Sequence, residues 1–283
     1  MKMRKFGIIT NGYKDVNLNI THMIADYIRS KGGEATIITE DHGEILDYEA
    51  MNYAKIPEGV EMLLVLGGDG TLIRVATGIR QNRVPLIGVN LGTLGYLCEV
   101  DTDSIYQAID ALMAGDYTIE ERMMLKGKTP DNDKTRSALN DIVIHRSGSL
   151  SILQLHLYVN GEKLCTYNAD GIILSTPTGS TGYNMSAGGP IVDPQANLIV
   201  LTPINAHTLN TRSIVLSADD TIEVEMGSRR FQRDEVALVS CDGDAIVELK
   251  VGDRFQITKS DHIIQIVKLS KESFLEILSK KMG

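Results

Sequence analysis

Hydrophobic and polar residues follow one spacing in the first hundred positions and another in the rest of the chain. Near the N-terminus, short apolar runs alternate with stretches whose apolar residues recur at helical spacing. The runs lie at 6–10, 34–39, 61–66 and 84–90, and the helical stretches at 18–33, 72–80 and 101–116. Such alternation predicts right-handed βαβ units and an open parallel sheet. The run at 61–66 is apolar on both faces, as a central parallel strand should be.

The second half of the chain is predicted to be mainly β. Residues 151–167 alternate apolar and polar side chains around an Asn160-Gly161 hairpin turn. Further strands are predicted at 221–226, 236–240, 245–258 and 262–269, and an amphipathic helix at 270–281. The polar segment 126–138 is interpreted as an exposed loop. The change of pattern near 114–125 predicts two domains, an α/β domain over 1–115 and a mainly β domain over 116–269.

Composition and charge exclude several classes of protein. The chain has 283 residues, 43% hydrophobic and 23% charged, which allows a buried core and argues against disorder. Its net charge of −9 disfavours duplex nucleic acid as a partner. No apolar run approaches the roughly 18 residues of a membrane span, and the N-terminal run is too short for a signal peptide. Widely spaced Cys98, Cys165 and Cys241 argue for a reducing compartment. We therefore expect a soluble, cytoplasmic protein that binds neither nucleic acid nor membrane.

An apolar strand ends at Gly67-Gly68-Asp69-Gly70, and an apolar helical pattern resumes at Thr71. The glycines form either a plain tight turn or a phosphate-binding loop. The motif is not a P-loop, because no Lys-Ser/Thr follows, and it lacks the third glycine of a dinucleotide fingerprint. Its place at the carboxyl end of a central strand is where open α/β sheets bind ligands. Asp69 would oppose a phosphate drawn by the helix amides, unless magnesium bridges them or Asp69 faces a neutral hydroxyl.

Three further stretches carry candidate ligand-binding groups. In "GVNLGTLGYL" (88–97), glycines allow close approach of backbone to a ligand and Tyr96 offers a flat face for a base, although a plain turn with a core tyrosine is the alternative. "STPTGSTGYNMSAGGP" (175–190) presents many hydroxyl groups and little bulk, which suits sugars and phosphates, and its segment 181–186 could open a helix. Asn140-Asp141 precedes an apolar strand, and such pairs are more often turn residues.

Taken in this order, these stretches resemble the NAD kinase family, whose members phosphorylate NAD to NADP. The similarity runs from about residue 6 to the last strands and includes 67–71, 88–97, Asn140-Asp141 and 170–190. The Gly-Gly-Asp-Gly motif alone is shared with diacylglycerol kinases, sphingosine kinases and phosphofructokinases. The stretch 175–190 is the specific part of the resemblance.

The resemblance implies a fold, substrates and site residues. It implies an N-terminal Rossmann-like α/β domain, a larger β domain, and a C-terminal helix, 270–283, that returns to the first domain. It implies ATP as phosphoryl donor, NAD as acceptor, Mg²⁺ held mainly by the ATP phosphates rather than by protein side chains, and a homodimer or homotetramer. Asp69 matches the catalytic aspartate that faces the adenosine ribose 2′-hydroxyl of NAD. The other positions implied to bind substrate are Gly67, Gly68, Gly70, Thr71, Arg74, Asn90, Tyr96, Asn140, Asp141, Asn168, Asp170, Thr178, Thr181, Gly182, Tyr183, Asn184, Met185, Ser186, Asn205 and Asp244.

Within that set, Asn168 and Asp170 match residues around the nicotinamide half of NAD, and 181–186 match the segment lining the adenosine half. Five features depart from the family's usual pattern, and one of them is the absence from "INAHTL" of the proline often found before His207. The other four are substitutions. Asn-Asp stands for Asn-Glu at 140–141, Gly182 for alanine, Asn168 for arginine or lysine, and Asp244 for glutamine. None of these changes removes a catalytic group, but those at Asn168 and Asp244 alter the charge available for recognition.

The implied reaction requires positioning and charge neutralisation rather than covalent catalysis. Mg²⁺ and the loop amides would hold the phosphates while Asp69 orients the 2′-hydroxyl. A carboxylate is a weak base for an alcohol, so orientation should outweigh early deprotonation. A lipid kinase is the alternative within this chemistry, disfavoured by the acidic chain and by 175–190. A catalytically silent NAD(P)-binding protein is the alternative from another class, disfavoured by intact Asp69. The sequence does not choose between NAD and NADH, or between ATP and polyphosphate.

Overall fold

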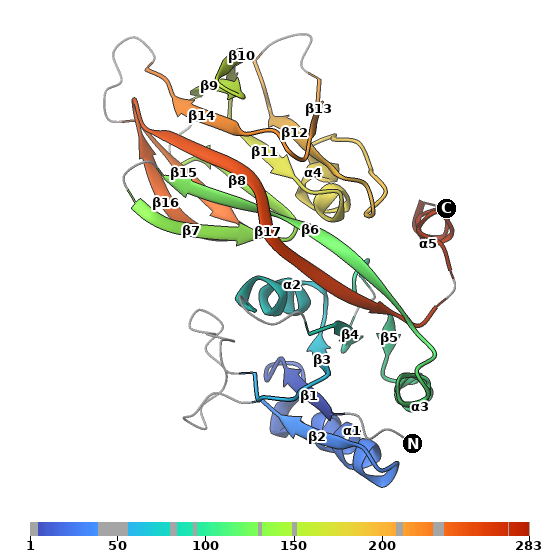
Figure 1. The fold of residues 1–283 in the computed structure, drawn as a ribbon. Helices are drawn as coiled ribbons and strands as arrows, with labels where there is room; N and C mark the ends of the chain where they lie inside the picture. Colours follow the sequence, from blue (N-terminus) through green and yellow to red (C-terminus); the bar gives the residue numbers. More distant parts are fainter. Residues whose placement is uncertain are drawn as a thin grey trace. The chain divides into compact units, whose positions relative to one another are not determined.

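The computed structural model describes residues 5–38, 56–79, 84–92, 95–129, 132–148, 152–207, 212–228, 235–270 and 272–282. It divides into two compact units (Figure 1). Unit 1 holds Met1–Glu121 and Ile264–Gly283, and unit 2 holds Arg122–Ile263. The chain passes from one unit to the other inside β6 (Thr118–Thr129) and β17 (Arg254–Lys268). Among the described residues, no helix has both the length and the apolar character that crossing a membrane requires.

Unit 1 is built on a parallel sheet whose central strand is β3 (Met62–Gly67). The other strands are β1 (Lys5–Thr10), β2 (Glu34–Ile37) and β4 (Leu86–Asn90), in the order β2-β1-β3-β4. Every residue of β3 is buried and both of its pairings are parallel, which confirms the predicted central strand. The short β5 (Val100–Asp101) and the C-terminal part of β17 also pair with β4.

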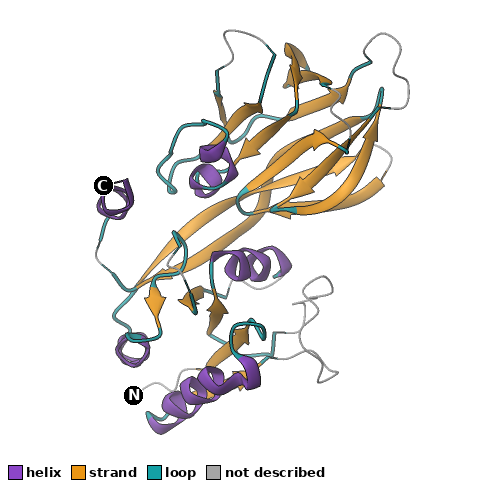
Figure 2. Ribbon diagram, turned by 180° about the vertical axis from the view of Figure 1, so that it is seen from behind, coloured by secondary structure: helices purple, strands orange, loops and turns teal. Residues whose placement is uncertain are grey.

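Helices cover both faces of this sheet (Figure 2). α1 (Asn19–Ser30) and α3 (Ile105–Ala114) bury Ile24, Ile28, Ile109 and Leu112 in one core cluster with the sheet. α2 (Asp69–Gly78) packs against β3 and β4 from the other side. It begins before the predicted start at residue 72, because Leu72 N already donates to Gly68 O at 3.1 Å. Unit 1 also holds the 3-10 turn η1 (Val16–Leu18) and the C-terminal helix α5 (Phe274–Met282).

Unit 2 consists of antiparallel sheets that share one hydrophobic core. One sheet has the order β13-β12-β11-β8-β15-β16, and in the other β10, β9, β14 and β17 are neighbours, with β6 joining β17 and β7. Leu155 and Val224 from the second sheet pack in the same cluster as Ile142 and Leu174 from the first. The bounds are β7 (Asn132–Ala138), β8 (Asp141–Arg146), β9 (Leu153–Val159), β10 (Glu162–Ala169), β11 (Gly171–Ser175), η3 (Thr178–Thr181), α4 (Tyr183–Ser186), β12 (Leu198–Ile204), β13 (Ile214–Ser217), β14 (Ile222–Met226), β15 (Val236–Cys241) and β16 (Asp244–Lys250).

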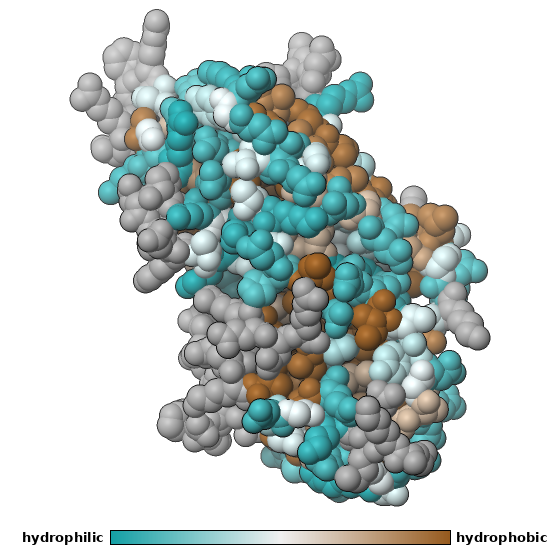
Figure 3. All heavy atoms as spheres, in the orientation of Figure 1, coloured by the Kyte–Doolittle hydropathy of each residue, from teal (hydrophilic) through white to brown (hydrophobic). Residues whose placement is uncertain are grey.

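Outward positions of these strands are mostly polar. β9 and β14 alternate buried and partly exposed residues along their length. In the view of Figure 3, hydrophilic side chains accordingly cover much of the described surface of unit 2. The period-two alternation of the sequence therefore identified the core face of these strands correctly.

Two sequence predictions in this region are wrong. The segment 126–138, expected as an exposed loop, forms most of the β6–β7 hairpin, in which Leu125 pairs with Ala138 and both are fully buried. Its polar residues occupy outward positions of strands, which loop composition does not reveal. The predicted strand 245–258 is instead a hairpin, because β16 ends at Lys250 and a turn at Gly252, with φ +91°, leads into β17. β17 then runs without a break through the separately predicted strand 262–269.

Candidate functional site

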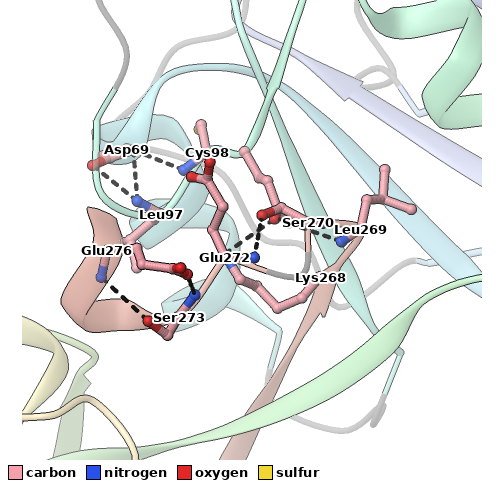
Figure 4. A network of polar contacts seen from close by, with 10 residues as sticks. Asp69, Leu97, Cys98, Lys268, Leu269, Ser270, Glu272, Ser273 and Glu276 are labelled. Atoms are coloured by element: carbon pink, nitrogen blue, oxygen red, sulfur yellow. Dashed lines mark hydrogen bonds and ion pairs between the residues drawn. The ribbon is translucent and has the colours of Figure 1, made fainter. Parts of the chain in front are cut away.

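Asp69 lies at the carboxyl end of β3 and is held there by the loop that follows β4. Three consecutive amides of that loop donate to its carboxylate, two of them from residues labelled in Figure 4. Tyr96 N donates to Oδ2 at 2.6 Å, Cys98 N to Oδ1 at 3.0 Å, and Leu97 N to both oxygens at 3.2 Å. A carboxylate offers about four acceptor positions, and these four contacts occupy them, although Leu97 N has a single proton to share between its two long contacts.

Gly95 allows the backbone of the loop to approach closely, as expected, but the group that it approaches is the carboxylate of Asp69. A Cβ atom at Gly95 would collide with the Asp69 carboxylate, so any larger residue would displace either the loop or the acid. Cys98 is buried on the same loop. Burial, with a further contribution from the charge of Asp69, raises the pKa of its thiol far above the usual range, so the thiol is neutral. Residues 93 and 94 of the predicted stretch lie outside the described residues.

Two residues that the sequence analysis did not identify contact the glycine turn. Asn11 Nδ2 donates to Thr71 Oγ1 at 3.2 Å, and Lys14 Nζ donates to Gly67 O at 3.1 Å. Both follow the first strand of the parallel sheet, so their position after the run 6–10 was the available signal, since parallel strands end at one edge. Asn90 is buried and folds back on its own loop, with Nδ2 donating to Gly92 O at 2.6 Å.

The loop that holds Asp69 continues into Glu99, which binds the C-terminal segment, whose Leu269 and Ser270 are labelled in Figure 4. Glu99 accepts hydrogen bonds from Leu269 N at 3.0 Å and Ser270 N at 2.8 Å, and lies 3.5 Å from Lys268 Nζ. Its side chain and that of Lys268 are 11% and 12% exposed, so the charges are largely withdrawn from water. The end of β17 is therefore tied to the residue next to the Asp69 loop.

In unit 2, Asp242 positions Asn140 and Asp141. Its carboxylate accepts hydrogen bonds from Leu139 N at 2.7 Å, Asn140 N at 2.8 Å and Asp141 N at 3.1 Å. Asp242 was not identified from the sequence. Its place in the turn between β15 and β16, with φ +49°, is typical of a structural aspartate.

Asp141 and Asp242 form a pair of carboxyl groups with perturbed protonation. Burial, with the charge of Asp242 adding to it, raises the pKa of Asp141 to about 7. Burial also raises the pKa of Asp242 to about 6, but its three amide donors oppose this shift. Because those amides stabilise the ionised form of Asp242, the proton of the pair resides first on Asp141.

The stretch 175–190 folds over Asn140 and is held mainly by its own side chains. Thr176 is buried, donates to Leu139 O at 2.6 Å and accepts from Gly179 N at 3.0 Å. Asn184 is fully buried, with Nδ2 donating to Ser180 O and Pro190 O and Oδ1 accepting from Thr202 Oγ1 at 2.7 Å. The side chain of Asn184 is thus used inside the protein. Of the predicted helical segment 181–186, Tyr183–Ser186 form the single turn α4, while Thr181 ends the 3-10 turn η3.

Two polar atoms beside this loop are buried without a hydrogen-bond partner among the described residues, Asn140 Oδ1 and Thr178 Oγ1. Buried polar atoms are nearly always paired, so unpaired ones indicate a missing partner. A ligand with hydroxyl or amine hydrogens would supply donors to both atoms.

A cavity of about 600 Å³ in unit 2 brings together Asp170, Tyr183 and Asn205 from the predicted set. Arg146 Nε lies 3.2 Å from Asp170 Oδ1, and Asn205 Nδ2 donates to Asp170 Oδ2 at 3.0 Å. The remaining lining residues are His145, Gly148 and Ile204. Asn168 does not line this cavity; its carbonyl accepts from His207 N at 2.8 Å. The cation of this cavity therefore comes from β8 rather than from position 168.

The predicted residues thus fall into two groups. Gly67, Gly68, Asp69, Gly70, Thr71, Arg74, Asn90 and Tyr96 belong to unit 1, and the others to unit 2. Several side chains are exposed, namely those of Arg74, Tyr183, Met185, Ser186, Asn205 and Asp244, while Thr181 is partly buried. Asp244, at the start of β16, lies outside the cavity lining.

No cluster of three or more His, Cys, Asp or Glu side chains suited to a metal ion occurs in the part of the chain that the structure describes. At the glycine turn the nearest acid is Asp69, whose oxygens already accept from three amides. A divalent cation would therefore find few protein ligands here and would depend on oxygens brought by a phosphate.

Two family models match the chain. The ATP-NAD kinase N-terminal domain matches residues 6–117, and the ATP-NAD kinase C-terminal domain matches residues 139–269. The NAD kinase of Agathobacter rectalis is 56% identical over 281 residues, covering 99% of both chains. The NAD kinase of Lachnoclostridium phytofermentans is 42% identical over 287 residues, also covering 99% of both.

Solved structures share the fold at lower identity. Yeast NADH kinase, in a complex with NADH, superposes with a TM-score of 0.83 at 24% identity, covering 100% of this chain and 88% of that one. An NAD kinase from Archaeoglobus fulgidus, in a complex with ATP, superposes with a TM-score of 0.75 at 22% identity, covering 98% of each. The arrangement of an α/β unit and a sheet-rich unit is therefore that of these enzymes.

Proposed function

The chain belongs to the NAD kinase family, and from this premise we propose which of its residues perform the reaction. The protein is a phosphotransferase that uses ATP to phosphorylate NAD, giving NADP. The γ-phosphoryl group is transferred to the 2′-hydroxyl of the adenosine ribose. The assignment of residues rests chiefly on one observation, the Asp69 carboxylate fixed by three amides at the carboxyl end of β3.

Asp69 is proposed to accept a hydrogen bond from the 2′-hydroxyl of NAD. Leu97 N shares one proton between two contacts of 3.2 Å, so a hydroxyl donor can take the place of one of them. The three amide donors also fix the carboxylate in one orientation, so its geometry does not have to be organised when substrate binds. Asp69 thereby directs the hydroxyl oxygen toward the γ-phosphorus, and proton transfer accompanies or follows bond formation.

The ATP phosphates are proposed to bind at the glycine turn. The amides that open α2, a ten-residue helix, would face an anion bound at its N-terminus, and Gly68 and Gly70 add no side chains of their own there. Mg²⁺ fits this site as a companion of the triphosphate rather than as a protein-held ion, because Asp69 is occupied by amides. When bound, it neutralises phosphate charge.

NAD is proposed to bind to unit 2 at two places. Asn140 and Thr178, whose buried oxygens lack donors among the described residues, together with 181–186, suit the adenosine half. The cavity of Asp170, Tyr183 and Asn205 suits the nicotinamide half. Arg146 supplies there the positive charge that Asn168 does not, which offsets that departure from the family pattern. Asn184 contributes by shaping the loop.

The remaining expectations stay proposals. A homodimer or homotetramer and the residue boundaries 1–115 and 116–269 rest on the family resemblance and the sequence pattern. The parallel order β2-β1-β3-β4 supports a Rossmann-like description of unit 1. The three cysteines, all free thiols, support a reducing compartment and hence the cytoplasm.

The function is tested by incubating the purified protein with NAD or NADH, each with ATP or polyphosphate plus Mg²⁺, and separating the nucleotides by chromatography. We expect NADP from NAD and ATP. Omission of Mg²⁺ should abolish the product if the ion accompanies the triphosphate. Absence of NADP under all donor conditions, with intact folded protein, would contradict the assignment.

A further inference from the structure

We propose that Lys14 is a phosphate-binding residue of this enzyme, whose ammonium group contacts the triphosphate of ATP at the glycine turn 67–70. Lys14 belongs to the loop after β1 and is absent from the set of residues that the sequence pattern singled out. The inference rests on the proposed function, because it assumes that the triphosphate binds at this turn.

The ammonium group of Lys14 lies beside the glycine turn. Lys14 Nζ donates to Gly67 O at 3.1 Å, the last residue of β3 before the turn. A Cβ atom built on Gly68 would lie 3.1 Å from Nζ, and one on Gly92 would lie 3.4 Å from it. The ammonium therefore sits against the backbone of both loops that surround Asp69. Side chains at Gly68 or Gly92 would crowd it.

The charges of Lys14 and Asp69 both affect the pKa of the buried Cys98 thiol. Burial is the main cause of the raised pKa of the Cys98 thiol, and the charge of Asp69 adds to it while the charge of Lys14 opposes it. Both charges are thus close enough to affect one buried group. A triphosphate entering the turn would be repelled by Asp69, and a cation beside it offsets that repulsion.

The backbone around Lys14 is fixed rather than freely solvated. Asn11 N donates to Leu66 O at 2.8 Å, and Lys14 N donates to Asn11 O at 2.9 Å. The next residue, Asp15, is buried and accepts from Ile20 N at 3.0 Å and Thr21 N at 2.8 Å, which anchors the loop to α1. The loop is thus fixed to β3 before Lys14, through Asn11, and to α1 after it, through Asp15.

The alternative is that Lys14 only ties its loop to Gly67. That role uses one N–H of the ammonium group, whose bond within the described residues is the one to Gly67 O. An ammonium has three donors, so two remain for oxygens from outside the protein. A neutral donor could replace Lys14 in a tie to a carbonyl, but it could not neutralise phosphate. This difference separates the two roles experimentally.

The test compares Lys14→Gln, Lys14→Met and Lys14→Arg with the wild type, using Lys31→Met as the control. Lys31 follows the last residue of α1 in the same unit, and its ammonium pairs with Asp110 at 2.8 Å. Initial rates are measured with ATP varied at saturating NAD, and with NAD varied at saturating ATP. Urea unfolding of each variant records whether the loop has lost stability.

We expect Lys14→Gln and Lys14→Met to lose about 100-fold in kcat/KM for ATP, with KM for NAD changed less than about threefold. Lys14→Arg should recover a substantial part, because it restores the charge. Lys31→Met should resemble the wild type. If Lys14→Gln keeps the wild-type kcat/KM for ATP, Lys14 is only a structural tie and the inference is wrong. It is equally wrong if ATP and NAD parameters worsen together. A wild type that makes no NADP contradicts the proposed function instead.

Discussion

Replacing Asp69 with asparagine changes one oxygen acceptor into a donor while keeping the size of the side chain. In the wild type, Tyr96 N and Cys98 N donate to different carboxylate oxygens, at 2.6 and 3.0 Å. In Asp69→Asn, one of these amides must face an NH₂ group. The variant therefore affects the loop that holds residue 69 as well as the reaction.

The magnitude follows from the contacts that are lost. A hydrogen bond to a charged group contributes about 1.5–3 kcal/mol, and a neutral one about 0.5–1.5 kcal/mol. Asp69→Asn removes one charged bond and makes the bonds of the other two amides neutral, so the free energy of unfolding should fall by about 3–6 kcal/mol. Turnover should fall at least about 100-fold, because the hydroxyl loses its fixed acceptor.

Three measurements check this prediction. Urea unfolding gives the change in stability, hydrogen exchange of the amides of residues 96–98 gives the local loosening, and initial rates give kcat and KM. Asp116→Asn is the matched control, since Asp116 is exposed in the same unit and its side chain makes no hydrogen bond within the described residues. That variant should keep wild-type stability and activity.

The structural role and the catalytic role of Asp69 can be refuted separately. Wild-type stability with unchanged exchange at residues 96–98 would show that the amides do not depend on the carboxylate. Near-normal turnover would show that Asp69 does not orient the acceptor. Loss of turnover together with loss of NAD binding would point to a collapsed loop rather than to a catalytic role.

Three further predictions concern other parts of the two units. Glu99→Gln leaves the poorly exposed Lys268 without its carboxylate, so urea unfolding should show that the free energy of unfolding falls by about 3 kcal/mol. Adding Lys268→Met should restore part of that stability, and no restoration would mean that the two residues are not coupled. Gly182→Ala should stay within about 1 kcal/mol of the wild type and keep KM for NAD, because φ is −94° and a Cβ would lie 3.2 Å from Gly179 O and 3.5 Å from Asn140 Nδ2. A loss above about 2 kcal/mol would show that the backbone at Gly179 cannot shift by the few tenths of an ångström that the Cβ requires. Because the pKa of Asp141 is raised to about 7, the folded protein holds a proton there between about pH 4 and 7 that the unfolded chain has released. The stability of the wild type in urea, measured relative to Asp141→Asn, should therefore fall as pH rises through that window. A relative rise in stability would contradict the raised pKa.

The sequence alone located the strand β3, its glycine turn and the specific loop 175–190, because each depends on neighbours in the chain. Apolar runs report burial locally, and glycines report tight turns locally. The same locality explains the errors. Residues 126–138 have the composition of a loop, and only pairing of β6 with β7 and burial of Leu125 against the core make them a hairpin.

Tertiary structure decided which groups meet. The carboxylate of Asp69 meets amides 27 to 29 residues later in the chain, Lys14 reaches Gly67 from 53 residues earlier, and Arg146 pairs with Asp170 from the neighbouring strand. No residue pattern encodes these contacts, because they depend on strand order and register, which long-range packing sets. The sequence therefore determined the kind of chemistry and its acidic residue, and the fold determined how that residue is held and which cation lies beside it.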